Sequence, residues 1–493
     1  MDFSPALLLG VIVVPAIGAA VLATLRVDRL GWPVAAASLS VTCLVSVLLA
    51  VTLVAGPADY RLGPAPGIVF RSDLLSATIG LLDVLLTLGI LAYTRTAGPH
   101  SWQFYTALLL FTTAVFGVVL AGDLVVVYGF LLVLIWSTAR LVVSGDKSGS
   151  ARAATAYRQT AGVGATVYLF GILLAISQGG TTDGQRLGAV LRTVGHTEPI
   201  VVASFVFSTI GLALLMALIP LHGWLVETHA NAADPVSALI SGVLPAVAIY
   251  PLARLLFDVY TVEFLAANPA ITSGMIYGAL GSLLAGNLLA YGQRDIKGIL
   301  AYSTVAQFGL ILTGFAMATE IAVFGAMIQL FGHGIVKGAL CLIAGIVSIR
   351  FQARTIEEFA GLADRAPVVA IAFVGLGIAM IGLPPTVGFV GKWYIALGAL
   401  ETGNWLVAGA VAVSTLLTLG YVVPFVDRIY FDSFDGVDTG FEMISRGMVA
   451  TVVLAVLIAF VIGLASVFLE ALLREAIANL VAVPEPEAPP AVD

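Results

Sequence analysis

The stretch Ile381-Gly-Leu-Pro-Pro-Thr-Val-Gly-Phe-Val-Gly-Lys-Trp393 interrupts a long apolar segment with two adjacent prolines and then places a lysine in it. Pro384 and Pro385 free nearby carbonyls, and non-helical backbone at membrane depth is tolerated only against protein or a water-filled cavity. A charge at the centre of a membrane helix costs about 2.5–3.5 kcal/mol on insertion scales, so it indicates a functional site by default. The stretch therefore predicts a broken membrane helix on a proton or cation path, with Lys392 as a member of that path.

The composition of the whole chain indicates a membrane protein. Of its 493 residues 60% are hydrophobic and only 10% are charged, whereas soluble domains carry about 25% charged residues. The mean hydropathy is +1.06. Because a helix needs about 20 apolar residues to cross a bilayer, the apolar segments predict an all-α fold of about fourteen transmembrane helices. The first segment is too long and too weakly flanked to be a cleaved signal peptide. The predicted spans are 4–25, 33–55, 73–94, 103–121, 123–143, 154–177, 200–219, 234–257, 272–292, 296–317, 320–349, 367–394, 404–427 and 447–473.

The distribution of cations predicts the orientation of these spans. Most Lys and Arg residues outside the membrane follow odd-numbered spans, and loops rich in Lys and Arg face the cytoplasm. We therefore expect a multi-pass protein of the cell membrane with both termini outside. The cations after odd-numbered spans are Arg26, Arg29, Arg95, Lys147, Arg152, Arg158, Arg294, Lys297, Arg350, Arg354, Arg365, Arg428 and Arg446, and those after even-numbered spans are Arg61, Arg71, Arg186, Arg192 and Arg254.

The sequence excludes several classes of function. Its loops are short, so no soluble catalytic domain is expected, and it has neither a phosphate-binding glycine motif nor a nucleophile elbow. The five histidines show no metal-ligand spacing, so we expect no metal and no other cofactor. The net charge of -7 reflects the outer loops and the tail 481–493, which is proline-rich and predicted to be disordered, and offers no surface for a nucleic acid. Cys43 and Cys341 lie in apolar spans, as small core residues do.

His333 and Lys337 form a candidate pair inside the membrane. Four residues apart on one helix, they lie on the same face. Histidine titrates near neutral pH, so the pair fits a proton path. The alternative is a packing histidine beside a lysine that binds backbone carbonyls. The cost of keeping both side chains in a lipid-embedded bundle favours the path.

Pro220 and Asp83 mark two further candidate positions. Pro220 breaks the seventh span just before His222 and Glu227, which either line an opening there or cap the second half-helix. Asp83 is a carboxylate in the middle of a span, and it either pairs with a buried cation or faces water.

The two proline-broken helices, in spans seven and twelve, suggest an inverted repeat. Spans four to eight form the first unit and spans nine to thirteen the second. The predicted organisation is N-terminal helices at 1–95, a first repeat at 103–257, a second repeat at 272–430, and a final transmembrane helix at 447–474.

Four ordered motifs resemble one family of membrane subunits. Besides the His333/Lys337 segment, they are Pro220-Leu-His-Gly-Trp-Leu225 with Asp234-Pro-Val-Ser-Ala-Leu-Ile-Ser-Gly-Val243, Gln293-Arg-Asp-Ile-Lys-Gly-Ile-Leu-Ala-Tyr-Ser-Thr-Val-Ala-Gln307, and Gly382–Lys392. The chain is similar to the antiporter-like subunits of Mrp-type Na+/H+ antiporters, respiratory complex I and energy-converting hydrogenases. Lys392, followed by Glu401-Thr-Gly-Asn-Trp405, most resembles the D subunit of Mrp antiporters.

The resemblance implies two inverted five-helix half-channels joined by a polar axis. It implies transport of H+ and Na+ within a multi-subunit antiporter or respiratory complex in the lipid bilayer. In the second half, His333, Lys337 and Lys392 match the family's path.

The first half departs from the family pattern. Leu132 stands where the family has a glutamate, and Leu215 stands where it has a lysine. The linking basic residue falls on Ser241 or Ala246, depending on the family pattern used.

Two hypotheses follow from this asymmetry. In the first, the chain is a subunit of a cation/proton antiporter complex whose proton path is retained only in the second half. In the second, it is a degenerate paralogue that scaffolds such a complex and moves nothing itself. Complex I, a hydrogenase, or a pair with a soluble zinc protein stay open as the assembly, because the redox or zinc chemistry would lie on a partner chain.

Overall fold

The apolar segments form helices because backbone polar groups in the bilayer core must be satisfied within the segment. The computed structural model describes residues 4–53, 58–62, 68–98, 100–145, 148–433 and 445–482. The N-terminal part comprises α1 (Ser4–Leu25), α2 (Asp28–Thr52) and α3 (Leu74–Ala97). A short antiparallel hairpin, β1 (Ala58–Leu62) and β2 (Ile68–Ser72), joins α2 to α3 and was not predicted.

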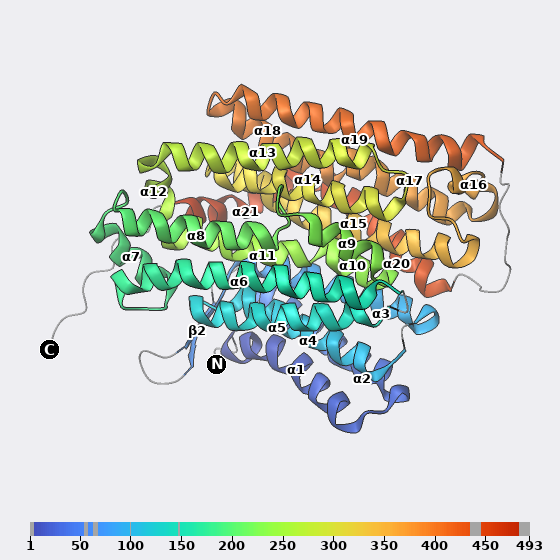
Figure 1. Cartoon of the computed structure of the whole chain (residues 1–493), viewed down its shortest axis with the longest axis horizontal. Coiled ribbons are helices and arrows are strands. Elements are labelled where there is room, and N and C mark those ends of the chain that lie inside the picture. The colour runs from blue at the N-terminus through green and yellow to red at the C-terminus, as the bar shows by residue number, and fades with distance from the viewer. Residues whose placement is uncertain are drawn as a thin grey trace.

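Two groups of helices follow, and in the view of Figure 1 the second group lies above the first. The first group, which we call the first repeat after the predicted organisation, comprises α4 (Trp102–Leu120), α5 (Leu124–Val143), α6 (Ser150–Gly179), α7 (Gly184–Val194), α8 (Pro199–Leu215), α9 (Gly223–Asn231), α10 (Asp234–Gly242), α11 (Leu244–Arg254), the π-helical turn η2 (Leu255–Val259) and α12 (Thr261–Ala267). The second comprises α13 (Pro269–Tyr291), α14 (Ile296–Ala316), α15 (Glu320–Phe351), η3 (Glu357–Phe359), α16 (Leu362–Arg365), α17 (Pro367–Ile381), α18 (Val387–Glu401) and α19 (Trp405–Phe431).

The prediction of a polytopic all-α membrane protein is confirmed. Within the described residues, twelve helices are long and apolar enough to cross a membrane. Two shorter apolar helices, α8 and α17, are the first halves of the broken seventh and twelfth spans. The first helices of the two repeats, α4 and α13, are the fourth and ninth crossings and so run in opposite directions through the membrane.

The C-terminal part differs from the prediction. The expected helix at 447–474 is two helices, α20 (Arg446–Leu464) and α21 (Ser466–Val481), which are separated by Ala465. Only α20 is apolar and long enough to be a candidate span. The predicted disordered tail 481–493 lies, beyond residue 482, outside the described residues.

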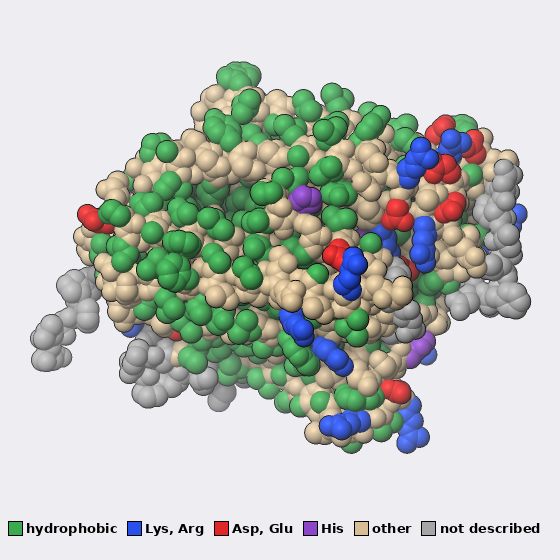
Figure 2. All heavy atoms as spheres, in the orientation of Figure 1, with side chains coloured by type: hydrophobic (Ala, Val, Ile, Leu, Met, Phe, Trp, Pro, Cys, Tyr) green, Lys and Arg blue, Asp and Glu red, His purple; other side chains and the backbone are tan. Residues whose placement is uncertain are grey.

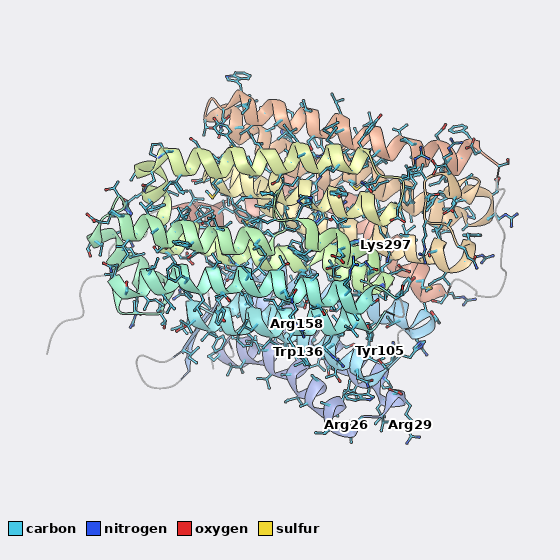
Figure 3. All side chains as sticks on the ribbon, viewed as in Figure 1. Arg26, Arg29, Tyr105, Trp136, Arg158 and Lys297 are labelled. Atoms are coloured by element: carbon cyan, nitrogen blue, oxygen red, sulfur yellow. The ribbon has the colours of Figure 1, made fainter. Side chains whose placement is uncertain are left out.

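Charged side chains gather toward one end of the helices. In Figure 2 hydrophobic side chains cover the middle of the visible face, while Lys, Arg, Asp and Glu collect toward the right. Arg26, Arg29 and Lys297 lie toward that same end in Figure 3. We refer to it as the cation-rich end. It carries the turns that follow odd-numbered spans, and the orientation predicted above would place it in the cytoplasm.

Candidate functional site

Lys392 lies at the break of the twelfth span. The helix α17 ends at Ile381, and Gly382 follows with a left-handed φ of +84°. The Lys392 side chain is buried, and its Nζ donates to the Ile381 carbonyl at 2.8 Å and to the Thr415 hydroxyl of α19 at 3.4 Å. The last carbonyls of a helix lack intrahelical partners and carry partial negative charge, so the lysine stabilises this helix end. The break and the charge therefore form one structural unit.

The broken seventh span of the first repeat is closed in the same way by a different side chain. There α8 ends at Leu215, and the indole Nε1 of Trp224 in α9 donates to the Leu214 carbonyl at 2.9 Å. In both repeats, a side chain of the second half-helix thus binds a carbonyl at the end of the first. The donor is an indole in the first repeat and an ammonium in the second, and of the two only the ammonium is an ordinary titratable group.

Lys337 has the same kinds of partners as Lys392. Its buried Nζ donates to the Leu300 carbonyl at 3.2 Å and to the Ser303 hydroxyl, both in α14. A carbonyl only accepts, and so it favours the charged ammonium. A hydroxyl can also donate, and so it can bind the amine after the proton has left. Both lysines are therefore held in a setting that accommodates the charged and the neutral form.

His333 binds a carbonyl at a third helix break, which was not predicted. The eighth span is divided at Val243 into α10 and α11. Pro245 lies four residues after Ser241 and has no N–H, so the Ser241 carbonyl lacks its helical donor. The Nε2 atom of His333 lies 3.2 Å from that carbonyl. Because the carbonyl only accepts, we assign the hydrogen to Nε2.

These two basic residues belong to a longer polar stripe along α15. Residues four apart share a face of a helix, and the stripe continues by one turn on each side of the predicted pair. Sequence reasoning missed the outer two members because an amide and a thiol are not costly charges, although their spacing could have revealed them. The members of the stripe are Gln329, His333, Lys337 and Cys341.

One end of the stripe reaches the lysine of the broken twelfth span. The Nε2 atom of Gln329 donates to Oε1 of Gln307 in α14 at 2.6 Å. The Gln329 side chain also packs against Gly391, where a Cβ would lie 2.2 Å from Oε1. Since Gly391 directly precedes Lys392, the stripe approaches the helix that carries this lysine.

The other end of the stripe connects to the cation-rich end. The Cys341 thiol lies 3.5 Å from Nε2 of the buried His229 in α9. The Ser237 hydroxyl donates to the His229 carbonyl at 3.1 Å and lies 3.1 Å from Lys297 Nζ. Lys297 also forms an ion pair with Asp234 at 2.5 Å. Buried polar contacts thus extend from α15 to the first turns of α10 and α14.

A second buried network joins α13 to α19 beside the lysines. The Asn287 amide accepts from the hydroxyls of Tyr421 and Thr418 at 3.1 and 3.2 Å, and donates to Ser414 at 3.0 Å. The residue after Ser414 is the hydroxyl partner of Lys392. Tyr421 also interacts with the Ser303 hydroxyl that binds Lys337. Polar groups of α14, α13 and α19 therefore surround the space between the two lysines.

The corresponding positions of the first repeat hold no charge. Leu132 is 42% exposed on the outer face of α5, whereas Leu215 and Ala246 are buried. Ser241 contributes a hydroxyl that lies 2.6 Å from the Thr304 hydroxyl. Neither candidate linking position is basic, so the polar path described above has no counterpart in these residues.

The charges that the first repeat does bury form a structural cluster. Arg254 pairs with Asp73 at 2.5 Å and with Asp258 at 3.3 Å, and its Nε donates to the Tyr250 hydroxyl. Burial acts to raise the pKa of Asp73, which lies just before the third span, but the Arg254 charge and hydrogen bonds from Arg254 and Ser76 outweigh it, so the net pKa is lowered. A cavity of about 30 Å³ beside Arg254 has room for water.

Pro220 does precede the half-helix α9, but His222 and Glu227 lie apart from the basic residues. His222 is the N-cap residue of α9, and its ring packs 5.8 Å from that of Tyr302. Glu227 forms an ion pair with the exposed Arg152 at 3.1 Å. Among the described residues, neither side chain forms a hydrogen bond or an ion pair with the stripe of α15.

Asp83 meets neither expectation for it. Its side chain is 0% exposed, so it does not face water. No ion pair to it exists among the described residues, and neither carboxyl oxygen has a hydrogen-bond partner within 3.5 Å. Among those residues, no group of three or more His, Cys, Asp or Glu side chains is arranged to hold a metal ion.

Comparison with known proteins gives consistent results for sequence and fold. Residues 121–418 match the family described as NADH:quinone oxidoreductase/Mrp antiporter, TM. The NADH-quinone oxidoreductase subunit N of Desulforudis audaxviator is 34% identical over 437 residues, which is 85% of each chain. A putative antiporter subunit mnhD2 of Staphylococcus aureus is 27% identical over 89% of this chain and 88% of that one.

Among solved structures, a chain of the Mrp complex from Dietzia sp. DQ12-45-1b superposes with a TM-score of 0.88. It is 24% identical, and the alignment covers 98% of both chains, so the similarity of fold extends over nearly the whole molecule. The family match covers more than half of the chain, and the curated relative above 30% identity covers most of it. The chain therefore belongs to the NADH:quinone oxidoreductase/Mrp antiporter transmembrane family.

Proposed function

We propose that this chain is the proton-moving subunit of a cation/proton antiporter complex of the Mrp type, with Na+ as the exchanged cation. The proton path runs through His333, Lys337 and Lys392 of the second repeat. The observation that carries the proposal is that each buried lysine binds one carbonyl and one hydroxyl, a setting suited to both protonation states.

Proton movement along this path needs only exchange between neighbouring groups. A proton passes from the ammonium of Lys337 or Lys392 to a neighbouring water, the hydroxyl partner turns to donate to the amine, and a proton from a water on the other side restores the ammonium. The amides Gln329 and Gln307 and the network around Asn287 keep the intervening region polar. The contacts from Cys341 through His229 to Lys297 lead from Lys337 toward the cation-rich end.

The first repeat supports the fold of the complex in this proposal. Its break is closed by an indole and its key positions are leucines, so it offers no titratable group where the second repeat has lysine. Neighbouring membrane subunits complete the assembly, in keeping with the Mrp complex whose chain has this fold.

Membrane vesicles that contain the assembled complex test the proposal. The variant Lys392→Ala is expected to abolish Na+-dependent proton movement, because it removes the only titratable group at this helix break. The control is Arg158→Ala, which removes an exposed cation of α6 and should keep the wild-type rate (Figure 3). Wild-type transport by an assembled Lys392→Ala complex would contradict the proposal and favour a scaffold role.

A second candidate is a membrane-arm subunit of an NADH:quinone oxidoreductase, favoured by the 34% identity to a subunit N. The proton path would then be driven by electron transfer on partner chains rather than by a Na+ gradient. Proton movement that starts on addition of NADH and is indifferent to Na+ would select this candidate. Movement that follows an imposed Na+ gradient without NADH would select the antiporter.

A further inference from the structure

Asp83 is a buried carboxyl that the path described above does not use. It lies within α3, nine residues after the first residue of the helix, which places it roughly 14 Å into the membrane. No other aspartate or glutamate of the described residues is buried to this degree. The polar group that faces it is the Thr112 hydroxyl of α4, which likewise has no hydrogen-bond partner within 3.5 Å.

This setting favours the protonated carboxyl. An ionised carboxylate taken out of water is unfavourable unless a cation or several donors compensate for the lost hydration, and Asp83 has no such partners. A protonated carboxyl can donate to the Thr112 oxygen, which would satisfy both groups with a small adjustment. Protonation of Asp83 therefore gives the pair a hydrogen bond in which the carboxyl donates and the threonine oxygen accepts.

The titratable groups on the packed helices do not neutralise Asp83. Its interactions are confined to Thr112, and the basic side chains nearby have other partners. Lys337 binds Leu300 and Ser303, His333 binds Ser241, and Arg254 binds two other carboxylates. The titratable residues of α2, α4, α10, α11, α15, α20 and β2 are Asp28, Arg29, Cys43, Arg71, Tyr105, Asp234, Tyr250, Arg254, Glu320, His333, Lys337, Cys341, Arg350 and Arg446.

The helix that carries Asp83 packs directly on the basic residues of the second repeat. Leu82 lies against Gly334, the residue after His333, where a Cβ would be 2.5 Å away. Leu86 lies against Gly338, the residue after Lys337, at the same distance. Asp83 is turned about 100° from Leu82 around α3 and so faces α4 of the first repeat. The helix α3 therefore touches the proton path with one face and holds a carboxyl against the first repeat with the next.

We propose that Asp83 is a proton-binding site that releases and takes up a proton during transport. In this equilibrium the carboxyl O–H bond breaks, the proton leaves to a neighbouring water or hydroxyl, and the carboxylate accepts the Thr112 hydroxyl. Rebinding reverses each step. The proposal rests on the proton-moving function assigned above.

Infrared spectroscopy and transport by the assembled complex test the site together. The wild type should show the carbonyl-stretch band of a protonated carboxylic acid, and this band should be lost in Asp83→Asn. The intensity of the band should change when transport is started. Asp83→Asn and Asp83→Leu should both lose proton movement, and Asp83→Leu should be more heat-stable than the wild type because it removes an unpaired polar group. Asp28→Asn, at the first residue of α2, is the control and should transport normally.

Two results would overturn the site. One is a wild-type spectrum without the band that Asp83→Asn removes. The other is normal transport by an assembled Asp83→Asn complex while Lys392→Ala is inactive, which leaves the proposed function intact. If instead Lys392→Ala transports normally, the proposed function fails, and the infrared band alone decides whether Asp83 binds a proton.

Discussion

The broken seventh and twelfth spans share a design and differ in one donor. In the first repeat the Trp224 indole binds the Leu214 carbonyl, and in the second the Lys392 ammonium binds the Ile381 carbonyl. Both donors satisfy a helix end at membrane depth, where an unpaired carbonyl is costly. An indole meets this need permanently, while an ammonium can also give its proton away. The comparison separates the structural requirement for a donor from the functional requirement for a titratable one.

The side chains around the two breaks differ in the same way as the two donors. The second repeat adds hydroxyl and amide networks around its lysines, whereas the first has leucines at the family's charged positions. The first repeat still buries Arg254, but in fixed ion pairs. Buried charge alone therefore does not identify a path: two carboxylates hold Arg254, whereas each of the two lysines binds a carbonyl and a hydroxyl.

The largest expected loss of stability lies in the first repeat. Arg254→Ala leaves two partly buried carboxylates without their cation and should cost about 3–5 kcal/mol of stability. Because the pKa of Asp73 is lowered in the folded protein, its pairing stabilises the fold above the ordinary carboxyl pKa and is lost as the pH falls. The gap in thermal stability between the wild type and Arg254→Ala should accordingly narrow in acid. Transport per folded complex should be unchanged, and a loss of rate without unfolding would give Arg254 a place in the path.

A lysine introduced into the first repeat should not create a second path. Leu215→Lys places a charge at a buried position and should destabilise the protein by about 2.5–3.5 kcal/mol. Leu132→Glu, at a 42% exposed position, should be tolerated better. Melting temperature and initial proton flux of both variants and of the double variant are the measurements. A gain in flux by the double variant would mean that the rest of a first half-channel is intact.

Gly382, at the break of the twelfth span, should be sensitive to the addition of a single methyl group. Gly382→Ala introduces a Cβ 2.9 Å from Lys392 Cδ at a residue with φ of +84°. A left-handed alanine costs about 1–2 kcal/mol, and the lysine must also move away from the Ile381 carbonyl. We expect lower thermal stability together with slower transport. Gly403→Ala, also at positive φ but with open space around its Cβ position, is the matched control and should affect stability alone.

The smallest effect is expected from the network between the lysines. Tyr421→Phe removes one hydroxyl that donates to Asn287 and should cost about 1 kcal/mol. If the network only joins helices, transport should be normal after correction for the amount of folded complex. A slower rate with a larger solvent isotope effect would assign it a role in proton movement.

The sequence predicted the features that depend on local composition. Apolar length located the helices to within a few residues, and the prolines located the breaks near Pro220 and Pro384. The break at Val243 was missed because Pro245 lies in an apolar run that looks continuous in the sequence. The division between α20 and α21 at Ala465 was missed because the sequence there is also continuously apolar. The hairpin β1–β2 was missed because the prediction assigned only the apolar spans, and both strands lie in the connection between two of them.

The candidate site was predicted in its charges but not in its partners. His333, Lys337 and Lys392 were identified because a basic residue in an apolar span is rare. The carbonyl partners of His333 and Lys337 belong to other helices, and no local pattern reveals which basic side chain an unpaired carbonyl will meet. Gln329 was not singled out and Cys341 was interpreted as a small core residue, because neutral polar side chains are common in membrane helices.

The proton flux of two matched variants, Trp224→Phe and Lys392→Met, tests the central claim most directly. Each variant replaces the side-chain donor at one helix break with an apolar side chain of similar size. With equal amounts of assembled complex in the vesicles, we predict that Trp224→Phe moves protons at the wild-type rate per folded molecule and that Lys392→Met moves none. Proton movement by Lys392→Met, or equal loss in both variants, would contradict the account.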